Sequence, residues 1–252
     1  MKVSVVIPNR REQLAMLNQT VQSFRAAGAD ETIAVSDPRG KGPAWARNAG
    51  ADLSTGDVIV WSDSHCTWEE GDFRAFCKRA LDEDAILCAP TASMDHPKKF
   101  VAYGAKWGRH PEWPGYEIIM HGRERETAEV LYGSVYAVSR DTYKKLGGWP
   151  KTISWGYNEE AMSLAAKHHG VEIRMGIGCL ILHKFKEKLP YAVRGLDPLV
   201  NRMIVHKQFS TDDEWSEHWA PLFMEHKQAW DRFERREKRL AAVKKMPDDL
   251  LP

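Results

Sequence analysis

Over residues 1–93, short apolar runs rich in β-branched residues alternate with segments whose apolar residues recur at helical spacing. Runs of the first kind predict buried strands, and segments of the second kind predict amphipathic helices. The predicted strands cover 3–7, 32–36, 58–61 and 85–89, and the predicted helices cover 12–27, 44–51 and 72–81. Strands and helices that succeed each other in this way form βα units, which favour an α/β domain.

The pattern changes in the second half of the chain. Periodicity fades over 94–129, where His, Pro, Trp, Gly, Lys and Arg crowd together, and a long irregular insertion is usually functional. The predicted elements beyond it are strands at 131–139, 172–175 and 179–182, helices at 140–146 and 158–169, and a largely helical tail at 196–245. We therefore expect one domain over 1–195, in halves of 1–93 and 94–195, and a helical C-terminal extension over 196–252.

The composition is that of an ordinary globular protein and says little about function. The 252 residues are 43% hydrophobic and 28% charged with a formal net charge of +1, which gives no overall attraction to nucleic acid or to a membrane. The apolar run at the N-terminus is too short for a signal peptide, and no run approaches the roughly 20 apolar residues of a membrane helix. The cysteines form no CxxC pair, so reduced thiols and a cytoplasmic location are expected.

Two potential metal ligands follow the strand predicted at 58–61. Asp63 and His65 are alternate residues, and alternate residues of an extended chain point to the same side. In an open α/β sheet, ligands bind outside the carboxyl ends of the strands. The sequence therefore predicts that Asp63 and His65 face one ion, and a further histidine, His183, ends another predicted strand.

Several motifs occur together in one order along the chain. They are Val3-Ser-Val-Val-Ile-Pro-Asn9, Ala46-Arg-Asn-Ala-Gly-Ala51 with Thr55-Gly-Asp57, Asp63-Ser-His-Cys66, Gly147-Gly148-Trp149, Trp155-Gly-Tyr-Asn-Glu159, and His183-Lys-Phe-Lys-Glu-Lys-Leu-Pro-Tyr191. This set resembles glycosyltransferases of the GT-A fold with family 2-like sequences. In its motifs it is closest to the catalytic domain of polypeptide N-acetylgalactosaminyltransferases. The resemblance covers about residues 1 to 205 and implies a Rossmann-like mixed sheet flanked by helices, with 1–93 as the nucleotide-binding half and 94–195 as the acceptor and metal half.

The resemblance implies metal-dependent transfer from a UDP-sugar, plausibly a UDP-N-acetylhexosamine. Asp63, His65 and His183 would be the metal ligands, and a divalent cation stabilises a departing diphosphate. One carboxylate and two imidazoles suit Mn²⁺ better than Mg²⁺, which prefers oxygen ligands. Each residue taken singly could be an ordinary surface Asp or His. The ordered set of motifs is what favours a metal site.

A second set of residues is expected to bind the nucleotide part of the donor. Asp37 could accept hydrogen bonds from uracil or ribose, or it could cap a turn. Arg47 could contact the donor, or it could pair with Asp52 or Asp57 on the surface. The predicted donor-binding residues are Pro8, Asn9, Arg10, Asp37, Arg47, Ser64, Lys186 and Tyr191.

Three of the candidate residues would cover the diphosphate by resemblance to the family. They are Trp155, Lys186 and Tyr191, and donors at this place act mostly in the transition state because charge develops on the leaving phosphate. Trp155 could instead be a core residue and Lys186 a solvated charge. The family has an arginine at Lys186, so a bidentate phosphate contact becomes a point charge here.

Two acids open the helix predicted at 158–169 and are the remaining catalytic candidates beside Trp155. Glu159 or Glu160 could hold sugar hydroxyls or deprotonate the acceptor, but their place at a helix start would also explain them electrostatically. The family's WGGEN segment has an extra residue here, which leaves open whether Asn158 or Glu159 takes the acidic position. The resemblance favours retention of configuration, in which the departing phosphate can take the acceptor proton.

The acceptor is inferred from basic and aromatic residues rather than from a motif. Residues 98–125 carry six cations interleaved with aromatic rings, and the predicted tail is basic, a combination that suits a nucleic acid strand. The cations are Lys98, Lys99, Lys106, Arg109, Arg123 and Arg125, and the aromatic residues are Tyr103, Trp107, Trp113 and Tyr116. They could equally form a packed loop with solvated charges.

The favoured acceptor is a hydroxymethylated pyrimidine in DNA, of the kind some bacteriophage enzymes modify. Protein Ser or Thr and an envelope glycan are the alternatives. Two hypotheses from other functional classes are a non-catalytic UDP-sugar binder and a nucleotidyltransferase-like enzyme. The second would favour a Gly-rich basic signature after the first strand, which this sequence lacks.

Overall fold

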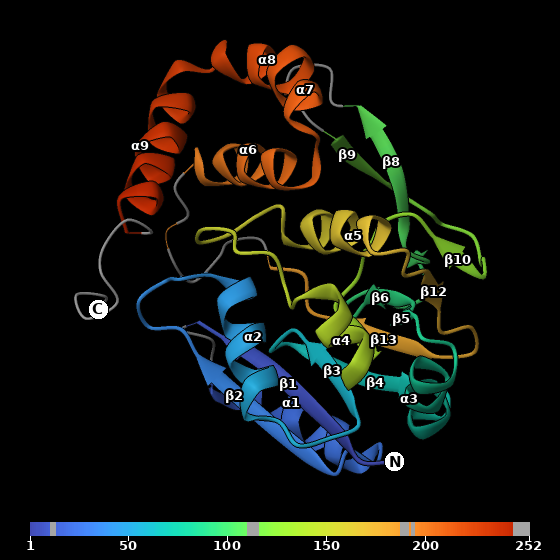
Figure 1. Ribbon diagram of the computed structural model, residues 1–252. Helices are drawn as coiled ribbons and strands as arrows, with labels where there is room; N and C mark the ends of the chain where they lie inside the picture. Colours follow the sequence, from blue (N-terminus) through green and yellow to red (C-terminus); the bar gives the residue numbers. More distant parts are fainter. Residues whose placement is uncertain (11–13, 110–115, 187–191, 193–194, 244–252) are drawn as a thin grey trace.

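The computed structural model describes residues 1–10, 14–109, 116–186, 192 and 195–243, and it is organised around a seven-stranded mixed sheet. The strand order is β10-β12-β5-β11-β3-β1-β2. Figure 1 shows this sheet in the lower half of the molecule with helices on both of its faces. This architecture confirms the predicted α/β class with a helical C-terminal region.

The first three strands and their connecting helices follow the predicted βα succession. The strands are β1 (Val3–Asn9), β2 (Glu31–Ser36) and β3 (Val58–Ser62), and the helices are α1 (Leu14–Ala26), α2 (Pro43–Leu53) and α3 (Phe73–Asp82). β1 lies between β2 and β3 and runs parallel to both, so the three carboxyl ends share one edge of the sheet. That edge carries the residues that follow Asn9, Ser36 and Ser62.

A later strand enters the middle of the sheet in the opposite direction. β11 (Val135–Ser139) is antiparallel to both β3 and β5 (Ile86–Cys88), whereas β12 (Ile173–Met175) is parallel to β5. The prediction began this strand at residue 131, but the chain over 131–134 is irregular. There the Leu131 amide donates to the Ser163 hydroxyl instead of to a neighbouring strand. Helix α4 (Arg140–Leu146) follows β11 as predicted, and β10 (Thr127–Ala128) closes the sheet at its edge.

A second sheet forms beside the carboxyl end of β3. Of its four strands, the sequence predicted only the one at 179–182. Its order is β4-β13-β6-β7, where β4 is Cys66–Glu70, β13 is Leu180–His183, β6 is Thr91–Ser93 and β7 is Val101–Ala102. β4 turns back directly after the predicted metal ligands, and His183 of β13 pairs with Cys66 of β4. This pairing brings His183 to the end of β3.

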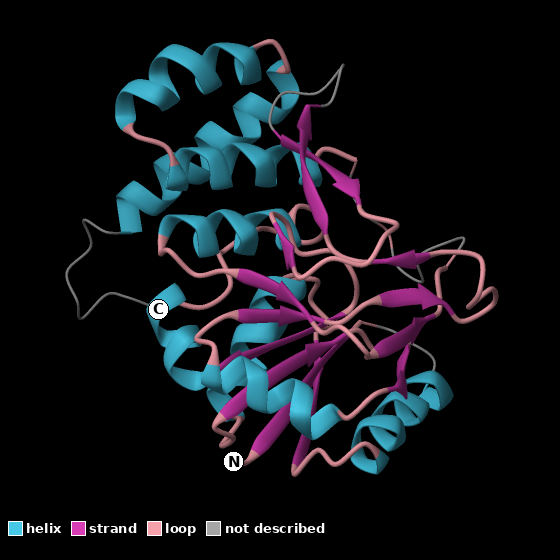
Figure 2. Cartoon of the chain, turned by 90° about the vertical axis from the view of Figure 1, so that its right-hand side faces the viewer, coloured by secondary structure: helices cyan, strands magenta, loops and turns pink. Residues whose placement is uncertain are grey.

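The segment 94–129 is more regular than the prediction of an irregular insertion. It contains a hairpin of β8 (Ala105–Arg109) and β9 (Tyr116–Met120), which projects beside the helices in Figure 2. Residues 110–115, with Trp113, lie outside the described residues. The many Gly, Pro and charged residues of this segment hide its short apolar stretch at Ile118 and Ile119 from a periodicity argument.

The C-terminal helices stack on α5 (Asn158–His168) and not on the sheet. They are α6 (Asp197–Phe209), α7 (Asp212–Glu214), α8 (Ala220–Met224) and α9 (Lys227–Val243), with a π-helical stretch at Trp215–Trp219 between α7 and α8. Figure 1 shows α6 between α5 and α9. Trp219, Phe223 and Phe233 are buried against Leu199 and Met203 of α6, so this layer has an apolar core of its own.

Helix α2 lies unusually close to β1 at Gly50. A Cβ atom there would lie 2.2 Å from Val6 Cγ1 and 3.0 Å from Val35 Cγ2. We expect Gly50→Ala to lower the free energy of unfolding by about 1 to 3 kcal/mol, because overpacking outweighs the gain in helix propensity. Urea denaturation would measure it, with Gly195→Ala as the control because no atom lies within 4 Å of a Cβ there. Equal stability of both variants would contradict this close packing.

Candidate active site

Three side chains from two sheets converge at the carboxyl end of β3. Ligand atoms of Asp63, His65 and His183 all lie within 4.8 Å of one another, and the His183 Nε2 atom is 3.5 Å from an Asp63 carboxylate oxygen. The two imidazole rings are 4.6 Å apart. The sequence predicted these three residues as metal ligands, and the structure brings them together. One carboxylate and two imidazoles at this spacing fit a divalent cation such as Mn²⁺.

The protonation states of this cluster suit a cation. Burial opposes ionisation of Asp63, but the hydrogen bond from His183 and the charges of His65 and Arg47 outweigh it, so the pKa of Asp63 lies below its usual value. The pKa of His65 is lowered to about 4. Burial is the largest cause, and the charges of His183 and Lys186 add to it, whereas the negative charge of Asp63 opposes them. At neutral pH His65 is therefore a neutral imidazole, which is the form that binds metals.

Arg47 lies behind the cluster rather than in the donor pocket. Its side chain, from α2, is 3% exposed, and its Nη2 atom is 2.9 Å from Glu159 Oε1 and 3.5 Å from Asp63 Oδ1. The guanidinium carbon lies 4.1 Å from the centre of a Trp149 ring, in a cation–π arrangement. Neither sequence alternative anticipated this, since Arg47 was assigned to the donor or to a surface pair with Asp52 or Asp57. The spacing of residues on α2 does not show which of its faces is buried.

The predicted donor residues surround a cavity of about 290 Å³ next to the cluster. Its lining includes seven of the predicted donor or catalytic residues, namely Pro8, Asn9, Arg10, Asp37, Ser64, Trp155 and Lys186. The Lys186 Nζ atom is 3.2 Å from His65 Nδ1, so its charge lies directly beside the proposed metal site. Tyr191 lies outside the described residues, and its predicted contact with the diphosphate stays a prediction.

The carboxylate of Asp37 builds the wall of this cavity. Its two oxygens accept hydrogen bonds of 2.8 Å from the backbone N–H groups of Lys41 and Gly42. The structure therefore favours the turn-cap alternative over a carboxylate held open for uracil. Gly42 is required there, because its φ is 111° and a Cβ atom would lie 1.9 Å from the Ser154 carbonyl oxygen.

A second cavity, of about 470 Å³, lies on the other side of the cluster. We call it the inner chamber. It shares Pro43, Asp63, Trp155, His183 and Phe185 with the donor cavity, whereas His65 lines the donor cavity alone, so Asp63, His183 and Trp155 stand between the two spaces. Its further lining residues include Thr91, Ile118, Tyr132, Glu159 and Glu160. The sequence did not single out Thr91, Ile118 or Tyr132, which lie in segments without any motif signal.

The two acids at the start of α5 differ in their surroundings. Glu159 pairs with Arg47, whereas burial, with the charge of Glu159 adding to it, raises the pKa of Glu160 to about 7. Asn158 also lines the inner chamber, but its Oδ1 atom is taken up by a 2.7 Å hydrogen bond from the Thr152 hydroxyl. Of the residues that compete for the family's acidic position, Glu159 is thus the one tied to the metal cluster.

Comparisons with known proteins find relatives of part of this chain. The family model described as Glycosyl transferase family 2 matches residues 34–147. A mouse protein, Polypeptide N-acetylgalactosaminyltransferase 4, is 26% identical over 165 residues, which are 58% of this chain and 28% of the relative. The Caenorhabditis elegans Probable N-acetylgalactosaminyltransferase 9 is 25% identical over 201 residues, 73% of this chain and 34% of the relative. The chain spans about a third of the length of these curated relatives.

Solved structures share the fold at low sequence identity. GalNAc-T7 with UDP, GalNAc and Mn²⁺ has a TM-score of 0.62 at 15% identity over 82% of this chain and 48% of that one. Staphylococcus aureus TarS (residues 1–349) with UDP-GlcNAc has a TM-score of 0.55 at 13% identity, over 86% and 76% of the two chains. The mannosyltransferase PcManGT from Pyrobaculum calidifontis, with GDP-Man and Mn²⁺, has 0.53 at 12%, over 98% and 76%.

The family model covers part of the chain, and the solved structures show that the chain has the GT-A fold. The curated relatives named above are N-acetylgalactosaminyltransferases. Among the residues that the structure describes, no helix is both long enough and apolar enough to span a membrane.

The raised pKa of Glu160 predicts a pH dependence of stability. Between about pH 4.5, the ordinary value, and about pH 7, the folded protein holds more protons than the unfolded chain, so its stability falls as the pH rises through this window. We expect Glu160→Gln to match the wild type at pH 4.5 and to exceed its free energy of unfolding at pH 8 by on the order of 2 kcal/mol. Urea denaturation at both pH values would measure the difference.

The control is Glu217→Gln, which changes an exposed carboxyl and should leave the difference between the two pH values as in the wild type. A Glu160→Gln variant with the same pH dependence as the wild type would show that Glu160 ionises as freely in the folded protein as in the unfolded chain.

Proposed function

We propose that this protein is a metal-dependent glycosyltransferase that moves a sugar, an N-acetylhexosamine in the favoured case, from a UDP-sugar to an acceptor hydroxyl. The observation that carries the proposal is the cluster of Asp63, His65 and His183, of which all three line one cavity and Asp63 and His183 line a second. One cavity has the residues predicted to bind the nucleotide, and the other has carboxylates that can hold sugar and acceptor hydroxyls. Mn²⁺ bound by the cluster would neutralise the diphosphate as it leaves.

The residues around the cluster are proposed to have different roles in the transfer. Lys186, beside His65, is placed to add a positive charge where the leaving phosphate develops its own. Trp155, 40% exposed, can close over the bond between phosphate and sugar from the boundary of the two cavities. Arg47 holds Asp63 and Glu159 at fixed positions on either side.

The two acids bear differently on retention and inversion. Direct displacement with inversion needs a general base near the acceptor hydroxyl. Glu159 is held by the Arg47 guanidinium at 2.9 Å, whereas a pKa of about 7 would suit Glu160 as a base at neutral pH. We propose retention, in which the departing phosphate accepts the acceptor's proton, and the support for it is the similarity to polypeptide N-acetylgalactosaminyltransferases.

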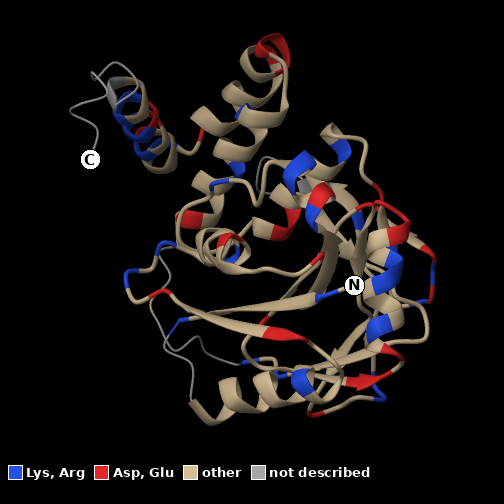
Figure 3. Cartoon of the chain, turned by 60° about the horizontal axis from the view of Figure 1, so that its bottom comes forward, with Lys and Arg blue, Asp and Glu red and all other residues tan. Residues whose placement is uncertain are grey.

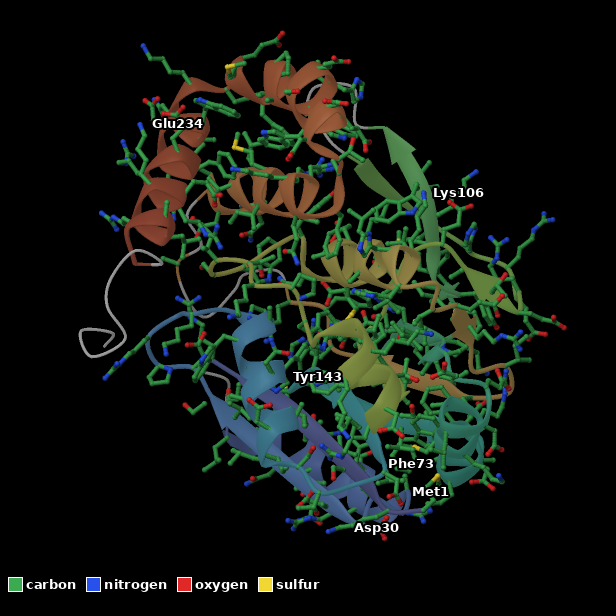
Figure 4. The ribbon with its side chains drawn as sticks, viewed as in Figure 1. Met1, Asp30, Phe73, Lys106, Tyr143 and Glu234 are labelled. Atoms are coloured by element: carbon green, nitrogen blue, oxygen red, sulfur yellow. The ribbon has the colours of Figure 1, made fainter. Side chains whose placement is uncertain are left out.

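For the acceptor we propose a hydroxymethylated pyrimidine in DNA, and the support is electrostatic. α9 carries Arg235, Arg236, Lys238 and Arg239, and Figure 3 shows cations and acids along this helix, with Arg236 paired to Glu237 and Lys238 to Glu234. The segment 98–125 supports a DNA acceptor less than its sequence indicated. Lys106, which Figure 4 places on β8, pairs with Ile119 and is thus on the opposite face of the hairpin from Ile118, which lines the chamber.

A hydroxyl of protein Ser or Thr is the second candidate acceptor. It is favoured by the relatives, whose names describe transfer to polypeptides. A polypeptide does not require the cations of α9, and the inner chamber would accept a neutral side-chain hydroxyl equally well. An envelope glycan is the third candidate and has no observation of its own in the described residues.

Removing a metal ligand should abolish turnover without unfolding the protein. We expect His65→Ala and His183→Ala each to lower the rate of Mn²⁺-dependent UDP release from a UDP-sugar by about 100-fold or more, since each removes one of three protein ligands. His96→Ala, an exposed histidine away from the cluster, is the matched control and should keep full activity. Full wild-type activity in EDTA would overturn the metal assignment.

The acceptor proposals are separated by mass spectrometry after incubation with a panel of UDP-sugars. We expect a hexosamine-sized mass increase on hydroxymethylated DNA and none on unmodified DNA or on Ser/Thr peptides. Binding to that DNA should weaken steeply with salt, because phosphate contacts release counterions. Replacing Arg235 and Arg239 by Gln together should flatten the salt dependence. Transfer to peptides alone would establish the second candidate instead.

A further inference from the structure

The turn that carries Trp155 has an unfavourable backbone conformation, which contacts with neighbouring elements must stabilise. Ser154 and Tyr157 have positive φ angles of 48° and 61°, and Gly156 has a φ of 93°. Non-glycine residues in this region cost on the order of 1 to 3 kcal/mol each, and they persist only where the surroundings fix them. Such strain is common at sites that hold a ligand. The support must therefore come from the elements that pack against residues 152–157.

Helix α6 supplies this support through Asn201, which is 0% exposed. Its Oδ1 atom accepts a 2.7 Å hydrogen bond from the Ile153 N–H group. Its Nδ2 atom donates to the carbonyl oxygens of Ile153 and Gly156, both at 2.8 Å, and reaches that of Trp155 at 3.4 Å. One buried amide thus contacts the backbone on both sides of Trp155 and satisfies groups that would otherwise be buried without partners.

Two further contacts join the same helix to the same turn. The Tyr157 hydroxyl and the His206 Nε2 atom are 3.1 Å apart, and both residues are buried. A Cβ atom on Gly156 would lie 2.9 Å from Pro198 Cγ, so the turn rests directly on the first residues of α6. On its other side, the Ser154 N–H group donates to the Lys41 carbonyl, in the loop that forms the wall of the donor cavity.

We propose that Asn201 is a positioning residue of the active site. Its side-chain amide holds the turn 152–157 in the shape that sets Trp155 between the donor cavity and the inner chamber. The C-terminal helical layer thereby becomes part of the machinery that binds the donor, although the Glycosyl transferase family 2 match ends at residue 147, well before α6. The part of the inference that concerns the donor rests on the proposed function.

The decisive variant is Asn201→Asp, which has nearly the same size. It keeps the acceptor for the Ile153 N–H group but places an oxygen against the carbonyl groups of Ile153 and Gly156, so the turn should move away from α6. We expect hydrogen exchange of the backbone amides over 152–157 to accelerate at least about tenfold. In the same protein, the dissociation constant of UDP in the presence of Mn²⁺, measured by calorimetry, should rise about tenfold.

The matched control is Phe233→Leu. Phe233 of α9 is buried in the apolar core that α6 shares with α8 and α9, so its truncation destabilises the same helical layer while leaving the contacts of Asn201 in place. We expect this variant to unfold at a lower temperature than the wild type but to bind UDP and Mn²⁺ with unchanged affinity. An equal loss of UDP affinity in both variants would show general loosening and would overturn a positioning role.

A second variant changes the same contact on the side of the turn instead of on α6. Gly156→Ala forces a side chain against Pro198 and should weaken UDP binding even though Asn201 is intact, which keeps the test decisive if Asn201→Asp fails to fold. Unchanged exchange and unchanged UDP affinity in the variants would refute the inference. If the wild type itself does not bind UDP with Mn²⁺, the proposed function fails, and hydrogen exchange alone still decides whether Asn201 holds the turn.

Discussion

The site depends on one buried cation. Arg47 is 3% exposed, and a guanidinium in such a position must be neutralised by partners with good geometry. Its partners are Asp63, at the end of β3, and Glu159, at the start of α5. Since these carboxylates belong to elements far apart in the sequence, the single charge fixes the metal cluster relative to the inner chamber. The Trp149 ring against the guanidinium limits how far it can shift.

Topology supplies the rest of the cluster. β11 is antiparallel to both β3 and β5, so β5 and β12 run in the same direction as β1, β2 and β3. The antiparallel insertion of β11 lets the backbone N–H of Asp63 donate to the Ser134 carbonyl, and the small sheet pairs His183 with Cys66. The third predicted metal ligand therefore arrives through strand pairing at a distance along the chain, which holds its imidazole more firmly than a loop would.

The sequence predicted what depends on local pattern and failed where tertiary packing decides. The first strands, the helices between them and the ligands Asp63 and His65 follow from apolar runs and from alternation at a strand end. The face that α2 buries does not, so the position of Arg47 was missed. Asp37 was predicted to bind uracil or ribose, with a turn cap as the alternative, because a sequence does not show whether backbone N–H groups of its own loop take up the carboxylate. Asn201 carried no signal, since nothing in α6 indicates which turn lies beneath it.

The charges around the two cavities constrain any acceptor. Glu159 and Glu160 line the inner chamber, but Arg47 lines it too and pairs with Glu159, and a pKa of about 7 leaves Glu160 partly protonated at neutral pH. The chamber therefore suits a neutral hydroxyl better than an anionic phosphate group, whereas the cations of α9 lie outside on another layer. In a DNA strand, a base turned out of the stack would bring a neutral hydroxymethyl group into the chamber while the phosphates stay outside. A peptide hydroxyl would reach the same chamber without that rearrangement, so the more distant charges, and not the chamber, distinguish the two acceptors.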